Sequence, residues 1–334
     1  MREERKKMKL FVYSYREFDE ADYFQQAAEE YGIEIAFTAE EPSMENADFA
    51  EGYPYVSIIT TKIDEELLKK FWNLGVRMIS TRTIGYDHID VEVAKRIGFH
   101  ISHVTYSPEC VADYTLMLML MCIRKMKRIM QREELNDFSL PGIRGRELRG
   151  FTVGVIGTGR IGQAVIRDLS GFGCRIYAYD LYRNAEVERY AEYVELKEIY
   201  ETCDMITLHM PLNDANYHMI DHDAIGKMRK GTVLINTARG ALIDTAALLD
   251  GLESEQIGAV GLDVIEDEFG MYYYDRKSDI LSKRDLYTLR GFPNVIVTPH
   301  MAFYTEEAVG DMVRHSVKSC VLHEAGKEDP WEVV

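Results

Sequence analysis

The chain has 334 residues, a length that suits two domains of ordinary size. Hydrophobic residues make up 46% of it and charged residues 28%, which predicts packed cores beneath a polar surface. The formal net charge is −17, and this acidic excess argues against nucleic acid or an anionic membrane as a partner. A small anionic substrate is still compatible with the charge, because one local Arg can dominate a pocket.

The five cysteines indicate neither a disulfide framework nor a zinc site, since their number is odd and no C-x-x-C pair occurs. They are Cys110, Cys122, Cys174, Cys203 and Cys320. The first residues, MREERKKMKLFVYS, are charged and lack the apolar region of a secretory signal. The apolar run LMLMLMCI is too short to span a bilayer. We therefore expect a cytoplasmic protein without a bound metal.

Strand-like and helix-like runs alternate over the first part of the chain. The expected strands are 8–14, 33–39, 55–60, 76–85 and 99–105, and the expected helices are 19–32, 64–75 and 88–98. Such alternation predicts a parallel sheet with helices on both faces. The first hundred residues therefore indicate a small α/β domain of their own.

One long helix is expected over 107–138, with Ser107 as its cap and Pro108 in its first turn. Its first half is apolar on nearly every side. Core packing is the plain interpretation of its Met-rich stripe. A subunit interface is the alternative, and with it a homodimer.

The alternation resumes after residue 150. Six strands are expected at 152–157, 174–180, 204–210, 232–238, 257–264 and 294–299, with helices at 160–173, 196–203, 223–231 and 244–256. A last helix is expected at 305–326. If that helix returns to the first domain, the second domain is an insertion into the first, and the nucleotide-binding motif described next falls in mid-chain.

A glycine-rich turn, GTGRIG, follows the strand TVGVI and opens a helix. Gly157 permits the tight turn, Gly159 lets a pyrophosphate approach the helix N-terminus, and Gly162 allows close packing of helix and strand. Asp180 ends the next strand, 23 residues after Gly157. Its carboxylate would bind the adenosine ribose and repel a 2′-phosphate, so NAD is expected rather than NADP. An ordinary glycine-rich turn beside a surface Asp is the alternative.

Three polar residues, Arg239, Glu268 and His300, each follow the end of a predicted strand. Since the carboxyl ends of parallel strands share one edge of the sheet, where ligands bind, we expect one site. Arg offers a planar fork to a carboxylate, His carries a proton near neutral pH, and a carboxylate beside it favours the imidazolium. The set suits reduction of a ketone by hydride, with His300 as acid, Glu268 orienting it and Arg239 holding the substrate. Individually, a structural histidine and a surface arginine are the alternatives.

Four motifs resemble those of the D-specific 2-hydroxyacid dehydrogenases: GTGRIG, INTARGALID, GLDVIEDE and NVIVTPHMAFYT. The resemblance extends over nearly the whole chain, and it is strongest to the D-lactate dehydrogenase branch, which includes the vancomycin-resistance type. It implies a Rossmann NAD-binding domain, 107–300, inserted into a flavodoxin-like substrate domain, 1–106 and 301–334. Both would be doubly wound parallel-sheet α/β domains.

The resemblance also implies roles for single residues. The three polar residues named above match the family's catalytic Arg, Glu and His. Ile84 and Gly85 would bind the substrate carboxylate through backbone N–H groups, and Tyr106 and Phe303 would contact the substrate, although both are also plausible core aromatics. The further cofactor-binding residues that it implies are Arg160, Ile161, His209, Met210, Pro211, Thr237, Ala238 and Asp263.

One departure concerns the turn before the catalytic Glu, where Asp267 stands in place of the Gly usual in lactate enzymes. The expected function is reduction of pyruvate to D-lactate by NADH. Two alternatives stay open: reduction of bulkier 2-oxo acids, such as 4-methyl-2-oxopentanoate or phenylpyruvate, and a non-catalytic NADH-sensing protein on the same fold.

Overall fold

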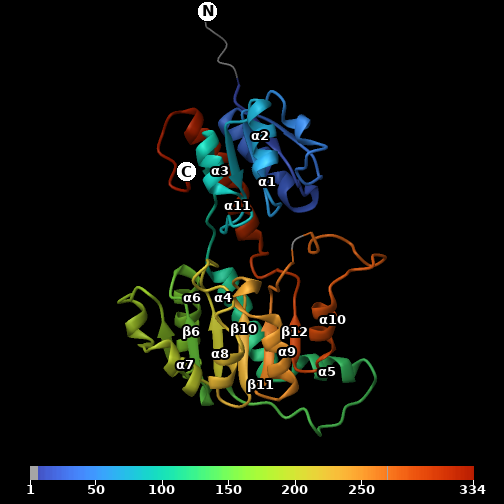
Figure 1. Cartoon of the computed structure of the whole chain (residues 1–334), viewed down its shortest axis with the longest axis vertical. Helices are drawn as coiled ribbons and strands as arrows, with labels where there is room; N and C mark the ends of the chain where they lie inside the picture. Colours follow the sequence, from blue (N-terminus) through green and yellow to red (C-terminus); the bar gives the residue numbers. More distant parts are fainter. Residues whose placement is uncertain (1–6, 269) are drawn as a thin grey trace, which may run out of the picture. The chain divides into compact units, whose positions relative to one another are not determined.

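The chain divides into two compact units in the computed structural model, which describes residues 7–268 and 270–334 (Figure 1). The first unit comprises Met1–Ser107 and Tyr304–Val334, and the second comprises Pro108–Phe303. Each contains one sheet whose paired strands all run parallel. The predicted fold class, two parallel-sheet α/β domains, is confirmed.

The sheet of the first unit has five strands in the order β2-β1-β3-β4-β5, which is the flavodoxin-like order. The strands are β1 Lys9–Val12, β2 Glu34–Phe37, β3 Tyr55–Ile58, β4 Met78–Thr81 and β5 His100–Ser102. The helices are α1 Glu17–Tyr31, α2 Glu65–Asn73, α3 Val91–Ile97 and α11 Glu306–Glu324, with the short 3-10 helix η1 Ala47–Ala50.

The two faces of this sheet bury separate apolar clusters. Leu68 and Phe71 of α2 belong to the cluster on one face, and Phe24 of α1 belongs to the other. The second cluster also contains Val313 and Val317 of α11, so the last helix of the chain completes the core of the first unit. Helices on both faces explain why the strands are apolar along most of their length.

The sheet of the second unit has seven strands in the order β12-β11-β10-β9-β6-β7-β8. They are β6 Thr152–Ile156, β7 Arg175–Tyr179, β8 Glu192–Tyr193, β9 Met205–Leu208, β10 Thr232–Asn236, β11 Ile257–Leu262 and β12 Val295–Val297. The order matches a Rossmann sheet, in which the order of the strands reverses between β6 and β9 while the two strands stay parallel. The prediction of six strands is wrong by one: β8, only two residues long, pairs with β7 and forms the edge of the sheet.

Helices cover both faces of the second sheet as well. They are α4 Glu109–Ile123, α5 Met126–Glu133, α6 Arg160–Ser170, α7 Leu196–Thr202, α8 His222–Lys227, α9 Thr245–Glu253 and α10 Arg284–Gly291, with 3-10 helices η2 Leu148–Gly150, η3 Val187–Arg189 and η4 Gly240–Leu242. Helices α4 and α6 bury one cluster, and α7, α8, α9 and α10 bury the other. No helix was predicted at α10, whose mostly polar sequence buries only Leu286 and Leu289.

The long helix predicted for 107–138 is two helices. It breaks between α4 and α5 at Lys125, which has a φ of 54° in the left-handed region. The carbonyl of Ile123 accepts a hydrogen bond from the backbone N–H of Arg146 at 3.1 Å instead of continuing the helix. A Cβ on Gly145 would lie 2.7 Å from that carbonyl oxygen, so the returning loop needs glycine there. The break is therefore set by a loop twenty residues later in the chain.

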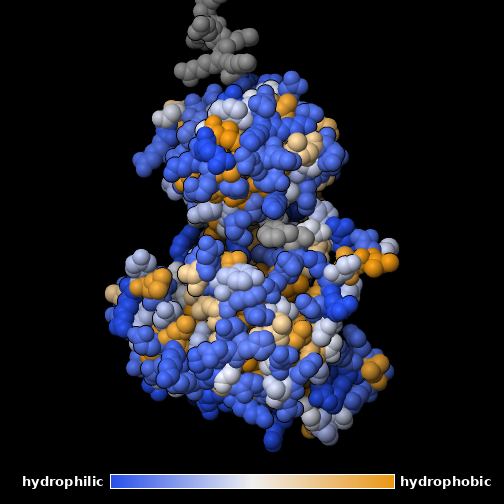
Figure 2. All heavy atoms as spheres, viewed as in Figure 1, coloured by the Kyte–Doolittle hydropathy of each residue, from blue (hydrophilic) through white to orange (hydrophobic). Residues whose placement is uncertain are grey.

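Hydrophilic residues cover most of the surface visible in Figure 2, and hydrophobic residues appear between them in separate groups. Among residues 7–268 and 270–334, no helix combines the length and the apolar character needed to cross a membrane.

Candidate active site

The glycine-rich turn joins β6 to α6, and two of its glycines are required by packing. Gly157 has a φ of 95°, and a Cβ there would lie 2.5 Å from the carbonyl oxygen of His209. A Cβ on Gly162 would lie 2.0 Å from the carbonyl oxygen of Gly157. The turn therefore packs directly on the segment that follows β9, so both segments can contribute to one cofactor site.

Gly159 differs from both, because no heavy atom of the described residues, its chain neighbours apart, lies within 4 Å of the position that its Cβ would occupy. This open space lies at the N-terminus of α6, whose first residues are Arg160 and Ile161. Unpaired N–H groups and the helix dipole favour an anion at such a position. The cradle fits the pyrophosphate of a dinucleotide.

Asp180 lies just beyond β7 and braces the same turn. One oxygen of its carboxylate, Oδ2, accepts hydrogen bonds from the backbone N–H of Thr158 at 2.6 Å and from the Thr158 hydroxyl at 3.2 Å. The other, Oδ1, accepts from the backbone N–H of Tyr182 at 3.1 Å. Asp180 is therefore a structural residue of the turn as well as the predicted ribose ligand.

The segment after β9 carries His209, Met210 and Pro211. Burial lowers the pKa of His209 to about 3, so its ring is neutral at physiological pH. Its Nε2 is 2.9 Å from the hydroxyl of Thr207, while its buried Nδ1 has no hydrogen-bond partner among the described residues. Asn216 donates to the Pro211 carbonyl at 2.7 Å and fixes the segment beside the glycine turn.

His300 and Glu268 form a close pair. The distance from His300 Nδ1 to Glu268 Oε1 is 2.6 Å, and both side chains are partly buried, at 27% and 14% exposure. The other carboxylate oxygen accepts from the backbone N–H of Ile265 at 3.0 Å, which fixes its direction. The pair uses Nδ1, so Nε2 is the nitrogen from which a proton can be delivered.

Asp263, fully buried at the end of β11, organises the segment around His300. Its carboxylate accepts from the hydroxyl of Thr298 at 2.6 Å and from the backbone N–H groups of Met301 and Ala302, each at 2.8 Å. Its carbonyl accepts from the His300 N–H at 2.8 Å. These bonds hold His300 at a φ of 53°, in the left-handed region that non-glycine residues rarely adopt.

The loop of Arg239 follows β10 and is shaped by Asn236, a buried residue that the sequence did not single out. Asn236 donates to the Arg239 carbonyl at 2.8 Å and accepts from the N–H of Ala238 at 3.0 Å. A Cβ on Gly240 would lie 2.0 Å from the carbonyl carbon of Ile265. Gly240 therefore brings the Arg239 loop against the segment that leads to the catalytic pair. Gly240 was within a quoted motif, but only the structure reveals its role.

Thr237, at the start of the same loop, is buried, and its hydroxyl is 2.9 Å from that of Thr115 in α4. Within the second unit, the predicted residues thus form two groups at the carboxyl ends of the strands. One surrounds the glycine turn, and the other comprises the loops after β10, β11 and β12. Among the described residues, no cluster of three His, Cys, Asp or Glu side chains is arranged to bind a metal.

Asp267, the departure from the family's Gly, has a φ of 55°. The turn before Glu268 thus uses a left-handed conformation in which glycine is favoured and Asp is tolerated at modest cost. The substitution leaves the turn in place, with the carboxylate of Glu268 paired to His300.

An aromatic group adjoins the catalytic histidine. The ring of Phe303 is 6.5 Å from that of His300, and the ring of Tyr273 meets Phe303 edge to face at 6.1 Å, between ring centroids. Tyr273 was not among the predicted residues, because the segment after Glu268 shows no regular periodicity.

The remaining predicted residues, Ile84, Gly85 and Tyr106, belong to the first unit. The hydroxyl of Thr83 donates to the Gly85 carbonyl at 2.6 Å and so fixes the turn after β4. The preceding residue, Arg82, is fully buried and paired with Glu20 at 3.0 Å. The backbone that would bind a carboxylate is therefore rigidly supported.

Comparison with known proteins gives one consistent family. A family model described as D-isomer specific 2-hydroxyacid dehydrogenase, NAD binding domain, matches residues 116–302. An aromatic 2-oxoacid reductase of Clostridium sporogenes is 42% identical, over 92% of this chain and 93% of the relative. A D-specific alpha-keto acid dehydrogenase of Enterococcus faecium is 41% identical, over 93% and 96%. The apo structure of D-lactate dehydrogenase from Escherichia coli superposes with a TM-score of 0.86 at 34% identity, covering 98% of this chain and all of that one.

Proposed function

We propose a specific reaction from one premise: the chain belongs to the D-isomer specific 2-hydroxyacid dehydrogenase family. It is an NAD-dependent oxidoreductase, and its proposed reaction is the reduction of pyruvate to D-lactate. The observation that carries the proposal is the His300–Glu268 pair, 2.6 Å apart beside the ends of β11 and β12. A paired imidazole of this kind is the proton donor that ketone reduction requires.

The roles of the residues follow from the chemistry. NADH, when bound, supplies the hydride, and the carbonyl oxygen of the substrate gains negative charge. His300 protonates that oxygen from Nε2, while Glu268 orients the ring and stabilises the imidazolium. Arg239 binds the substrate carboxylate through its planar fork. Ile84 and Gly85 are proposed to donate backbone N–H groups to the same carboxylate.

Further side chains complete the proposed site. Tyr106 and Phe303 would contact the substrate side chain. The proposed cofactor ligands are Gly157, Gly159, Arg160, Ile161, Gly162, Asp180, His209, Met210, Pro211, Thr237, Ala238 and Asp263. We assign NAD binding to the domain predicted at 107–300 and substrate binding to 1–106 with 301–334.

Reduction of a bulkier 2-oxo acid is a second candidate, which the aromatic rings beside His300 favour. Phe303 and Tyr273 offer apolar faces to a planar side chain such as that of phenylpyruvate. The 42% identical relative named an aromatic 2-oxoacid reductase supports the same candidate.

A turnover panel tests the proposal and separates it from its alternatives. Pyruvate, 4-methyl-2-oxopentanoate and phenylpyruvate would each be reduced with NADH, and kcat/KM compared. The highest value for pyruvate supports the D-lactate assignment, and the highest value for phenylpyruvate supports the second candidate. NADH binding without turnover of any 2-oxo acid would instead indicate a non-catalytic NADH-sensing protein.

The Asp180 carboxylate predicts a preference for NADH over NADPH. Asp180→Ser should narrow the ratio of kcat/KM for the two cofactors, because the charge that repels a 2′-phosphate is removed. It should also weaken binding of both, since Thr158 loses its acceptor. Asp180→Asn is the control that keeps an acceptor while removing the charge. Equal use of NADPH by the unaltered protein would refute this account of Asp180.

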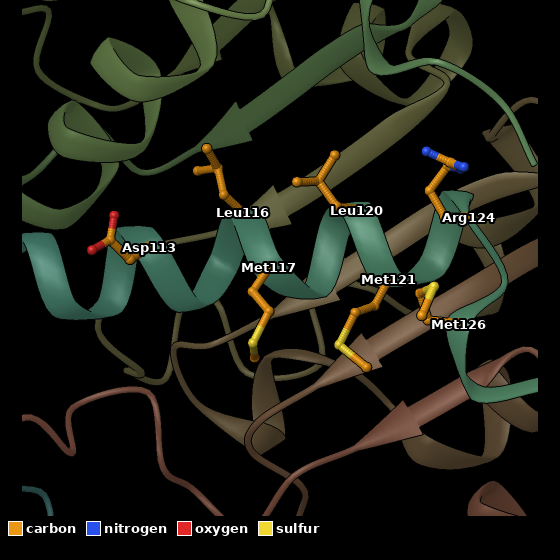
Figure 3. A pocket seen from close by; sticks show the side chains of 7 residues that line it. All are labelled: Asp113, Leu116, Met117, Leu120, Met121, Arg124 and Met126. Atoms are coloured by element: carbon orange, nitrogen blue, oxygen red, sulfur yellow. The ribbon is translucent and has the colours of Figure 1, made fainter. Parts of the chain in front are cut away.

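We also propose that the protein is a homodimer whose interface includes α4, α5 and the segment after them. Figure 3 shows Met117 and Met121 on one side of α4 and Leu116 and Leu120 on the other, and all four line the same mostly apolar groove. Helix α5 buries none of its residues. The exposed apolar side chains of this region are Met117, Met130, Leu135, Phe138 and Leu140. A second copy suits this surface, because a two-fold contact pairs each groove with the other chain's apolar segment.

A double variant, Met130→Glu with Phe138→Asp, should shift the protein from dimer to monomer, because each interface would bury four like charges. Light scattering after size exclusion measures the mass directly. Phe18→Asp, which changes an 80% exposed residue of α1, is the matched control and should leave the mass unchanged. A monomeric unaltered protein at micromolar concentration would refute the dimer.

A further inference from the structure

His300 is held at two points by residues that lie five positions apart in the segment after β11. Glu268 binds its ring at Nδ1, and the hydroxyl of Tyr273 donates to its backbone carbonyl at 2.9 Å. The backbone at Tyr273 is left-handed, with a φ of 72°, and this turn brings its ring back to His300. One segment thus fixes both the side chain and the main chain of the proton donor.

The main-chain bond matters because His300 itself has a left-handed backbone, with a φ of 53°. Such a conformation persists only where surrounding contacts determine it. Asp263 fixes the N–H of His300 and the two N–H groups that follow. Tyr273 fixes the carbonyl between them. Without the bond from Tyr273, the His300 carbonyl loses a contact that helps to fix the backbone carrying the imidazole ring.

Three tyrosines follow one another in this segment, and they differ in what their hydroxyls contact. Tyr272 packs against the core cluster that contains Met271, and its buried hydroxyl has no hydrogen-bond partner among the described residues. The ring of Tyr274 lies 5.0 Å from the guanidinium of Arg276. The hydroxyl of Tyr273 donates to the His300 carbonyl. The series therefore contains its own matched controls.

We propose that Tyr273 is a positioning residue for proton transfer, acting through the backbone of His300; this inference rests on the proposed ketone reduction. It is not among the residues proposed above to bind the cofactor or the substrate carboxylate. Through the His300 backbone, its hydroxyl fixes the position of Nε2 relative to the substrate oxygen. A displacement of Nε2 by about 1 Å lowers the rate by up to about 100-fold. Its ring supports Phe303 from the side and is unaffected when only the hydroxyl is removed.

Tyr273→Phe tests the proposal, with Tyr272→Phe as the control. We expect Tyr273→Phe to lower kcat about 10-fold or more, with little change in KM for the 2-oxo acid or in NADH affinity, because binding groups are untouched. The solvent deuterium isotope effect on kcat should rise, since proton transfer then limits turnover more strongly. A merely structural role would not move that isotope effect. Tyr272→Phe removes a hydroxyl from the adjacent ring and should leave both readouts unchanged.

Two outcomes separate this inference from the proposed function. If the unaltered protein reduces no 2-oxo acid, the proposed function fails. If it does, and Tyr273→Phe matches Tyr272→Phe in kcat and isotope effect, the positioning role is overturned. Equal melting temperatures of the two variants would show that folding does not account for a difference. If Tyr273→Phe melts lower, the isotope effect measured well below its melting temperature decides between the two roles.

Discussion

Replacing His300 with Gln will lower turnover of the 2-oxo acid by about 10²–10⁴-fold, the usual contribution of a positioned acid, while NADH still binds. Gln cannot donate a proton from a cationic ring, but it leaves the glycine turn and Asp180 untouched. His218→Gln is the matched control. His218 also has a φ of 53°, and its Nε2 pairs with Glu266 at 2.6 Å, yet it has no proposed role in catalysis.

Glu268→Gln should lower turnover without abolishing the reaction. The Glu268 carboxylate lies 2.6 Å from Nδ1 of His300 and orients the ring that delivers the proton from Nε2. Gln keeps the approximate shape and an oxygen that can accept a hydrogen bond from Nδ1, so its loss of kcat/KM should be smaller than that of His300→Gln.

Measurements of kcat/KM for the 2-oxo acid and of NADH affinity in each variant check this pair of expectations. A fully active His300→Gln protein would contradict the proton-donor role. A Glu268→Gln protein as active as the unaltered one would contradict the orienting role of Glu268.

We expect Gly240→Ala to lower activity because its Cβ clashes with a neighbouring loop, and not because alanine disfavours the backbone conformation at this position. The added Cβ would lie 2.0 Å from the carbonyl carbon of Ile265 and 2.5 Å from the backbone nitrogen of Glu266, so one of the two loops must move. Overpacking of this kind typically costs about 1–3 kcal/mol of stability. Displacing Arg239 from Glu268 and His300 by about 1 Å should lower kcat/KM about 100-fold.

Gly226→Ala provides the control for this variant. Gly226 lies within α8, and in the described part of the chain no heavy atom outside its neighbours and its own helix backbone lies within 4 Å of the position of its Cβ. Alanine there should raise the free energy of unfolding by about 0.5–1 kcal/mol without changing kcat/KM. Chemical denaturation and steady-state kinetics measure both quantities. Normal activity in Gly240→Ala would show that the two loops are not coupled.

The sequence predicted the parts of the fold that depend on local chemistry. Apolar runs of regular length marked the strands, and Gly157 and Gly162 were identified because their motif has a known geometry. Gly240 lies in the motif INTARGALID, but that motif does not show which backbone Gly240 approaches, because Ile265 lies twenty-five residues later. The break of the helix at Lys125 was not predicted for the same reason. It depends on the hydrogen bond from Arg146, and no proline or glycine near Lys125 indicates it in the sequence.

The candidate site divides in a similar way. Arg239, Glu268 and His300 were predicted because each follows a strand and its chemistry fits the reaction. The contact by which Glu268 orients His300 was expected, but the bonds from Asp263 and Tyr273 to the backbone around His300 were not, because they depend on turns with left-handed residues. Asp263 was expected near the cofactor, whereas its carboxylate in the structure binds the backbone after His300. Tyr273 acts through a carbonyl, and a sequence shows no sign of which carbonyl a hydroxyl will reach.

Because helix α11 completes the core of the first unit, that unit cannot finish folding until the end of the chain has been synthesised. Val313, Val317 and Cys320 of this helix share a buried cluster with Leu10 and Val12 of β1. A growing chain therefore makes β1 early but cannot cover that face of the sheet until residues 306–324 have emerged. The second unit is made entirely in between and holds all the strands of its own sheet. During translation the first unit to begin is thus the last to be completed, and its apolar face needs protection from other chains throughout that interval.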